Sequence, residues 1–273
     1  MVTASNLLAD GDEDILESVL AEVEGELYVV NPSGTTVEAL VSVAAATDDL
    51  PTIRLLADAS VLKAVMDDFL VASAAADLIE AGDLEIRTLE ETTENALLVT
   101  PTSVLALVAA GDRVAALATD DEAFVDTAMD AYAERFEAAE AFQFRTPALS
   151  RVRETLAAEI GDETRDDFDA ALDALEAARG DGSGLDEVTL SLLVAAKNEV
   201  LLYDISKWGE DVGIASKATF SRTKTKLEDL GLIDTEKVPI DVGRPRLRLK
   251  LGDDRLREAS AADLPDVARS LLG

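Results

Sequence analysis

The stretch that decides the fold of the last third of the chain is DISKWGEDVGIASKATFSRTKTKLEDLGLI, at residues 204–233. Within it, Gly213 marks a tight turn between two helical patterns, because glycine takes positive φ without strain. Ser216 follows at an N-cap position, and the helix predicted over residues 217–230 stops at a glycine. With a further amphipathic helix over residues 186–200, the pattern predicts a helix-turn-helix.

The helix predicted over residues 217–230 has an apolar side and a basic side. Four residues gather on the side that would be buried: Phe220, Thr223, Leu227 and Leu230. Residues 212–227 contain no acid, although 56 of the 273 residues are Asp or Glu. Such a face fits the major groove, where Arg reaches guanine and where Ser, Thr and Ala touch phosphates, bases or the thymine methyl group. We therefore predict DNA contacts from seven residues: Lys217, Ala218, Ser221, Arg222, Lys224, Thr225 and Lys226.

The next residues predict a wing over residues 233–251. Two strand-like runs, 233–238 and 246–251, are joined by a loop that contains proline and glycine. The second run alternates cations with leucines, so that one side lies on the core and the other offers charge to a phosphate backbone. The residue at the tip would enter or border the minor groove. The wing adds four predicted DNA contacts: Arg244, Arg246, Arg248 and Lys250.

The distribution of charge supports this prediction. The chain carries a net charge of -32, and residues 1–150 hold 6 basic and 30 acidic side chains. Residues 214–250 instead hold 9 basic and 5 acidic ones. Acid spread over a whole folded body favours a halophilic source over an ordinary acidic protein. Mimicry of nucleic acid is disfavoured, because the acids are interspersed through amphipathic segments and form no blocks.

The residues that are missing exclude several function classes. Without His or Cys the chain has no Ser-His-Asp or Cys-His catalysis, no thiolate or imidazole metal site and no disulfide. No Walker or GxGxxG pattern occurs, so we expect no catalytic residues, metal or cofactor, and an enzyme is the least favoured class. The longest apolar stretch, residues 102–111, falls short of the ~18 residues of a spanning helix. A signal peptide begins with a positively charged region, but no Lys or Arg precedes Arg54 in this sequence. We therefore predict a cytoplasmic protein with no membrane partner.

Residues 1–145 alternate strand and helix patterns. Strands predicted at 26–30, 52–57 and 84–88 are interleaved with helices at 12–23, 36–46 and 59–81. Two or three strands, over the ranges 96–100, 103–109 and 113–118, and a helix at 120–142 complete the pattern. This order predicts an α/β sandwich with a mixed sheet.

A turn after the first of these strands is a candidate anion or effector site. It could present N–H groups and hydroxyls at a helix N-terminus. It could equally be a simple connection in which a hydroxyl caps the helix, and short motifs carry a high false-positive risk. The candidate residues are Asn31, Ser33, Gly34 and Thr35.

Residues 146–184 are predicted to be a helical connector that ends in the glycine-rich linker GDGSG at residues 180–184. Its helices, at 148–160 and 164–179, carry a narrow apolar stripe: Val152, Leu156, Ile160, Phe168, Leu172 and Leu175. The stripe is either the seam of a homodimer or a face packed on the chain itself. Residues 185–273 then form the predicted winged helix-turn-helix domain.

The quoted stretch, followed by VGRPRLRLKL at residues 242–251, resembles the winged helix-turn-helix of archaeal transcriptional regulators. The whole chain resembles the TbsP-like family of haloarchaeal regulators. The first domain is similar to the phospholipase-D-like effector domains of the TrmB family, through NPSG at 31–34, TIRLLAD at 52–58 and AADLIEAGDLEIRT at 75–88.

These resemblances imply a sequence-specific regulator that binds promoter DNA of glycolytic and gluconeogenic genes. Because lipase chemistry of the phospholipase D type needs a histidine, the first domain is expected to be non-catalytic. TrmB carries its domains in the reverse order, so effector residues cannot be transferred and the effector stays unidentified. A winged-helix protein-interaction module and a metabolite sensor are the alternatives.

Overall fold

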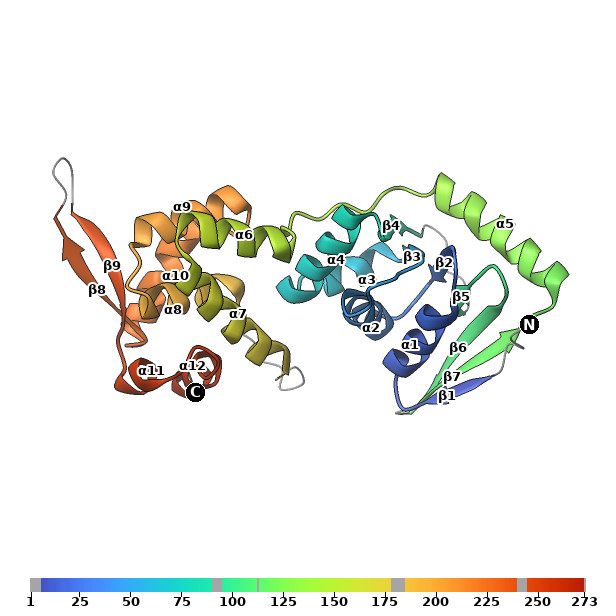
Figure 1. The fold of residues 1–273 in the computed structure, drawn as a ribbon, viewed down its shortest axis with the longest axis horizontal. Helices are drawn as coiled ribbons and strands as arrows, with labels where there is room; N and C mark the ends of the chain where they lie inside the picture. The colour runs from blue at the N-terminus through green and yellow to red at the C-terminus, as the bar shows by residue number, and fades with distance from the viewer. Residues whose placement is uncertain (1–5, 90–94, 112, 178–184, 240–244, 273) are drawn as a thin grey trace. The chain divides into compact units, whose positions relative to one another are not determined.

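The computed structural model describes residues 6–89, 95–111, 113–177, 185–239 and 245–272. The chain divides into two compact units, Met1–Ala148 and Leu149–Gly273 (Figure 1). No helix within the described ranges is long and apolar enough to cross a membrane. The first unit contains, in chain order, β1 (Leu7–Ala9), α1 (Asp12–Glu22), β2 (Glu26–Val30), α2 (Gly34–Ala45), β3 (Thr52–Ala57), α3 (Ala59–Val65), α4 (Phe69–Ala81), β4 (Leu84–Thr88), β5 (Ala96–Val99), β6 (Val104–Ala110), β7 (Arg113–Thr119) and α5 (Glu122–Ala138).

The first unit is built on one seven-stranded sheet of order β1-β7-β6-β5-β2-β3-β4. The neighbours β2, β3 and β4 are parallel, because helices return the chain between them. The remaining pairs are antiparallel, with β5, β6 and β7 forming a meander. The predicted α/β fold with a mixed sheet is therefore confirmed, although the short edge strand β1 was not predicted.

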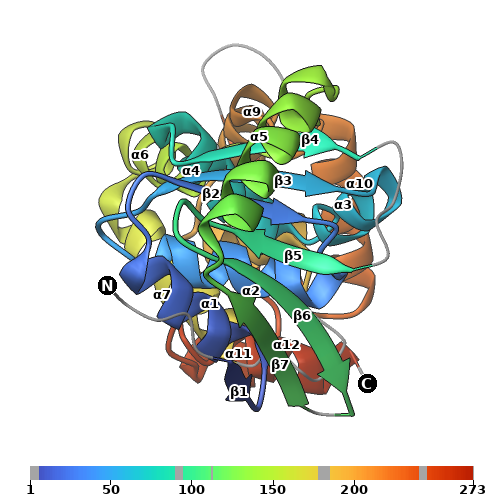
Figure 2. The ribbon, with the colours of Figure 1, turned by 90° about the vertical axis from the view of Figure 1, so that its right-hand side faces the viewer.

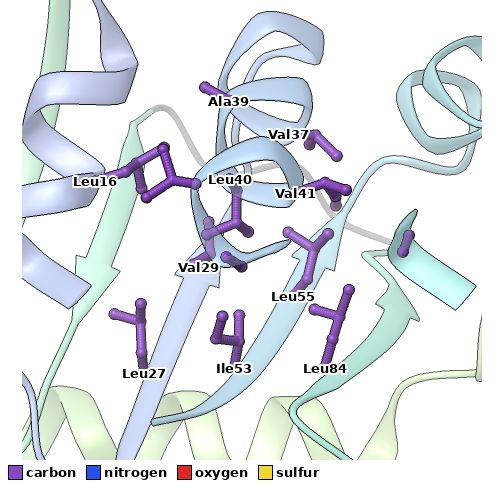
Figure 3. Close-up of a cluster of buried hydrophobic side chains, with 14 of the residues drawn as sticks. Leu16, Leu27, Val29, Val37, Ala39, Leu40, Val41, Ile53, Leu55 and Leu84 are labelled. Atoms are coloured by element: carbon purple, nitrogen blue, oxygen red, sulfur yellow. The ribbon is translucent and has the colours of Figure 1, made fainter. Parts of the chain in front are cut away.

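The two faces of this sheet are covered differently. Helices α1 to α4 pack on one face, where Leu16, Leu40 and Leu55 belong to one large buried cluster (Figure 3). The opposite face carries α5 (Figure 2). There the fully buried Phe136 packs on a smaller cluster that includes Tyr28.

Two arginines hold the last turn of α5 on the sheet. Arg87 of β4 donates hydrogen bonds to the carbonyl oxygens of Phe136 at 2.8 Å and Glu137 at 3.0 Å. Its guanidinium lies 4.6 Å from the centre of the Phe136 ring, and that of Arg54 lies 5.2 Å from it. Burial alone would lower the pKa of Arg54, but its hydrogen bond and charge interaction with Glu26 raise that pKa. The two guanidiniums lie at the end of α5, where carbonyl dipoles favour cations.

The prediction of one long helix over residues 59–81 is wrong. The structure contains α3 and α4, which are separated by three residues. The side chain of Asp68 accepts hydrogen bonds from the backbone N–H groups of Leu70 and Val71, and so caps the start of α4. An Asp that bonds to nearby N–H groups favours a new helix start over continuation of the preceding helix.

The second unit is helical with one hairpin. It contains α6 (Leu149–Glu159), α7 (Asp162–Ala177), α8 (Glu187–Lys197), α9 (Leu202–Val212), α10 (Lys217–Asp229), β8 (Ile233–Val238), β9 (Arg246–Leu251), α11 (Asp254–Glu258) and α12 (Leu264–Leu272). The last two helices were not predicted. The predicted linker at residues 180–184 lies outside the described residues.

Helices α6 and α7 pack within this second unit. The indole Nε1 of Trp208, which is buried in α9, donates to Thr155 Oγ1 of α6 at 3.0 Å. Four residues of the apolar stripe are buried here: Val152, Leu156, Phe168 and Leu172. These four side chains are therefore part of the core of the chain itself. Because they are already buried within one chain, they cannot form the seam of a dimer. The assignment of separate roles to residues 1–145, 146–184 and 185–273 stays a prediction.

Candidate nucleic-acid interface

Helices α9 and α10 form the turn that the sequence predicts. Gly213 has φ of 100°, and its N–H donates to the carbonyl of Gly209 at 3.2 Å. The hydroxyl of Ser216 accepts a hydrogen bond from the N–H of Thr219 at 3.2 Å, so Ser216 is the N-cap of α10. The turn thus fixes where the first residues of α10 begin.

The two helices pack closely at Gly209. A Cβ atom at this position would lie 2.3 Å and 2.4 Å from two ring atoms of Phe220. Phe220 is fully buried, so its ring fills the space that a side chain at position 209 would need. The sequence analysis did not single out Gly209, although a glycine inside a helix commonly marks close packing.

The exposed side of α10 agrees with the predicted DNA-contacting face. Phe220 and Leu227 are buried. Lys217 is half-buried, and five predicted residues are exposed: Ala218, Ser221, Arg222, Thr225 and Lys226. The prediction that Leu230 is buried is wrong, because the helix ends at Asp229 and Leu230 is 47% exposed.

Lys224 lies on a different side of α10 from these five residues. It is buried, and its Nζ donates to Glu228 Oε2 at 2.6 Å. Glu228 Oε1 in turn accepts from the hydroxyl of Thr235 on β8 at 2.7 Å. Burial would raise the pKa of Glu228, but the bonds from Lys224 and Thr235 lower it. Lys224 therefore ties α10 to the hairpin, and its ammonium does not point to the exposed face.

The hairpin of β8 and β9 has the predicted alternation. Leu249 and Leu251 are buried, and the N–H of Leu249 donates to the carbonyl of Val200 at 2.9 Å. The cations of β9 lie on the other side, with side chains 37–40% exposed: Arg246, Arg248 and Lys250. The predicted contact Arg244 lies outside the described residues.

Most of these cations form ion pairs with acids of the same unit. The pairs are Lys217–Glu210 at 2.6 Å, Arg246–Asp204 at 3.2 Å, Arg248–Glu199 at 3.8 Å and Lys250–Glu236 at 2.8 Å. Exposed pairs of this kind contribute little stability and are screened by salt, so a phosphate can replace the acid. Among the described residues Arg222 and Lys226 form no ion pair, and Arg222 donates only to Thr219 Oγ1 at 3.4 Å.

The carboxylate of Glu210, a residue of α9, lies at the N-terminus of α10. This carboxylate accepts from the backbone N–H of Lys217 at 3.2 Å and from the Nζ of the same residue at 2.6 Å. The hydrogen bond between the two side chains lowers the pKa of Glu210 and raises that of Lys217. A helix N-terminus with its N–H groups is also where a phosphate binds well, so Glu210 holds the place that a DNA phosphate could take.

Two family models together match nearly the whole chain. The TbsP-like N-terminal domain of transcriptional regulators matches residues 4–147, and the TbsP-like C-terminal helix-turn-helix domain matches residues 148–269. The chain belongs to the TbsP-like transcriptional regulators. No curated protein matches its sequence.

Three solved structures resemble parts of this TbsP-like chain weakly. TrmBL2, an archaeal chromatin protein, is 14% identical over 51% of this chain and 54% of its own, with a TM-score of 0.35. NucT from Helicobacter pylori is 14% identical over 50% and 99%, with a TM-score of 0.37. Nuc from Salmonella typhimurium, a phospholipase D family member, is 8% identical over 51% and 99%, with a TM-score of 0.34. This chain thus spans about half the length of TrmBL2, and likenesses this weak carry no argument about function.

One exposed residue of the TbsP-like helix-turn-helix was missed in the sequence. Tyr203, in the first turn of α9, is 48% exposed. The guanidinium of Arg246 lies 4.2 Å from the centre of its ring, so the tyrosine orients this wing cation. No periodicity or spacing in the sequence brings the two residues together, because the contact depends on how β9 packs beside α9.

The candidate anion turn in the first unit is a helix cap. Ser33 Oγ accepts from the N–H of Thr36 at 3.1 Å and lies 2.8 Å from the hydroxyl of Thr35. Thr36 Oγ1 donates to the carboxylate of Asp12 at 2.9 Å. A carboxylate this close disfavours an anion at this turn, which also contains Asn31 and Gly34. The effector role of the turn stays a prediction.

No group of three or more Asp, Glu, His or Cys residues within the described ranges could hold a metal.

Proposed function

We propose that this TbsP-like regulator binds double-stranded promoter DNA in a sequence-specific manner, with α10 in the major groove. One observation carries the proposal. The exposed face of α10 holds Arg222 and Lys226, presents no acid from Ala218 to Lys226, and begins at a capped N-terminus. This basic surface stands in a chain of net charge -32.

The residues of this face have different roles in the proposed complex. Arg222, which is exposed and outside any described ion pair, reads a guanine edge. Lys226 and Lys217 contact phosphates, as do the wing cations of β9, and these contacts fix the register without reading sequence. Lys224 acts as a positioning residue through Glu228.

The ion pairs explain how an acidic chain approaches DNA. Each paired cation exchanges its carboxylate for a phosphate when DNA binds, so the net gain per contact is small. The composition favours a salt-rich cell, and already at ~1 M salt the Debye length is about 3 Å, so the acidic first unit exerts almost no repulsion on DNA beyond that distance. The same salt weakens counterion release, so specificity must come from close contacts such as that of Arg222.

The finer parts of the proposal rest on the family resemblance. The regulator would act in the cytoplasm of a halophilic archaeon, on glycolytic and gluconeogenic promoters, as a homodimer. The first unit would set the oligomeric state or respond to an effector of unidentified chemistry. Catalysis of the phospholipase D type needs a histidine, and the sequence contains none. This supports a non-catalytic role for the first unit.

Fluorescence anisotropy of the full chain on labelled promoter fragments in high KCl tests the proposal. We expect some fragments to bind at least ten times more tightly than bulk DNA of random sequence. Equal affinity for every fragment would refute sequence-specific binding. Capture of a protein partner in the absence of DNA, together with such equal affinity, would instead favour the protein-interaction module.

A further inference from the structure

On β1, β6 and β7, the sheet of the first unit has an apolar area that none of the described helices of the unit covers. Every second side chain of β1, β6 and β7 points to the side of the sheet where α5 lies. Among these, Leu8, Val108 and Leu117 are 61%, 44% and 51% exposed. Their chain neighbours, such as Leu7 and Leu107, pack on the opposite face against α1 to α4. The outward set is therefore fixed by the pleat, which places successive residues on alternate faces.

The strand register brings these outward residues together. Leu8 pairs with Ala115, which pairs with Val108, and in the adjacent row Leu117 pairs with Ala106. Neighbouring strands lie about 4.8 Å apart, so Leu8 and Val108 are roughly 10 Å apart across the sheet. The outward apolar side chains thus form one continuous patch, which we call the β6–β7 face: Leu8, Ala106, Val108, Ala115 and Leu117.

Helix α5 covers a different part of this side of the sheet. Its buried residues, Val125 and Phe136, pack with Tyr28 and Val99 of the central strands. In Figure 2, α5 lies in front of the central strands of the sheet, and most of β6 and β7 is not covered by it. The first unit ends shortly after α5, and its following segment returns Phe142 and Phe144 to the large core on the other face.

The charges at this face are as unusual as its apolar character. β6 and β7 have seven residues each, none of which is acidic, and their one cation, Arg113, lies 3.5 Å from Asp10 at the end of the face. Residues 1–150 otherwise carry 30 acids. An exposed apolar patch rimmed by polar residues marks an interaction site more often than an ordinary surface.

We infer that the β6–β7 face binds the same face of a second copy of the chain, which makes the protein a two-fold symmetric dimer. Salt screens the repulsion between distant acids, but acids pressed together in a contact between two copies, each of net charge -32, still repel each other and lose their hydration. The β6–β7 face is the part of the described first unit where two copies place apolar groups on apolar groups without facing acids. A two-fold axis makes such a face self-complementary, with no second matching surface needed elsewhere.

The size of the face sets the expected strength. Seven-residue strands are about 23 Å long, and the three strands span roughly 10 Å. This footprint is smaller than the ~800 Å² per partner of a standard stable interface. The dimer is therefore expected to be weaker than a standard stable dimer and to form at high chain concentration.

Sedimentation equilibrium of the full chain without DNA, from about 1 to 100 µM in high KCl, tests this inference. The wild type should approach twice the 28.9 kDa chain mass as concentration rises. Leu117→Glu should weaken association at least tenfold, because it places a charge in the centre of the apolar contact. Leu8→Glu, on the edge strand, should do the same and keeps the test decisive if the first variant does not fold.

A matched control is Ile79→Glu, since Ile79 is an exposed apolar residue of α4 on the other side of the unit. It should associate like the wild type. A wild type that stays a single chain at 100 µM, or folded Leu117→Glu and Leu8→Glu variants that dimerise unchanged, would overturn the inference. The inference rests on the homodimer of the proposed function and assigns its contact surface; because no DNA is present, its failure is distinguishable from a failure of the proposed DNA binding.

Discussion

Substitution of Gly209 by alanine tests the packing that sets the angle of α10. The added Cβ would lie 2.3 Å from a ring carbon of Phe220, whereas carbon atoms in contact prefer about 3.5–4.0 Å. The helices must separate by more than 1 Å or the ring must leave its rotamer. Forced overpacking costs about 1–3 kcal/mol or more.

The net effect is the difference between two contributions. Alanine stabilises a helix interior by about 1 kcal/mol relative to glycine. With a clash at the upper end of the overpacking range, Gly209→Ala should therefore lower the free energy of unfolding of the second unit by about 2 kcal/mol. For an m-value near 2 kcal/mol per molar urea, the unfolding midpoint falls by about 1 M urea.

Trp208 makes this measurement specific to the second unit. It is the only tryptophan of the chain, and it is buried beside Gly209. Urea unfolding followed by its fluorescence in high KCl reports on this unit alone.

A double variant identifies the cause of the loss. Adding Phe220→Leu to Gly209→Ala should cost less than the sum of the two single effects, since the smaller side chain gives the new Cβ room. An unchanged or raised midpoint for Gly209→Ala, or additive losses in the double variant, would refute the packing argument.

Two further predictions concern carboxylates of the second unit. Glu210→Gln should raise DNA affinity about threefold to tenfold in anisotropy at fixed salt, because no carboxylate then competes with a phosphate for the N–H and Nζ of Lys217. Unchanged or lower affinity would contradict the proposed exchange. The pKa of Glu228 is lowered from 4.5 by Lys224, so Glu228 stabilises the fold above its unfolded pKa and loses that contribution as pH falls through its folded pKa. Glu228→Gln should therefore lose less stability than the wild type between pH 7 and about pH 3.5 in urea unfolding, and equal losses in both proteins would contradict this role.

Periodicity and capping predicted most of the fold because the deciding signals are local. Ser216 and Gly213 mark the turn of the helix-turn-helix by their own conformational preferences. The alternation of cations and leucines in β9 indicates correctly which side is buried. The break at Asp68 was missed because a capping Asp and an ordinary helical Asp look alike until the side chain is seen to bond.

The candidate site was less predictable because it depends on contacts between distant residues. The helical wheel placed Lys224 beside the DNA-contacting face, yet packing against β8 buries it next to Glu228. Likewise, the pairing of Arg246 with Asp204 joins residues 42 positions apart. Charge counted along the chain located the basic region correctly but did not reveal which of its cations form ion pairs.

The most direct test of the central claim is the base preference of Arg222→Ala compared with the wild type. Selection of bound sequences from a random DNA library in high KCl should enrich one motif for the wild type. Arg222→Ala should lose preference at one base pair by about 1–3 kcal/mol, or roughly 5- to 150-fold, while Arg255→Ala, an exposed arginine of α11, keeps the wild-type motif. No motif for the wild type, or the same motif at full strength for Arg222→Ala, would contradict the claim that α10 reads the major groove.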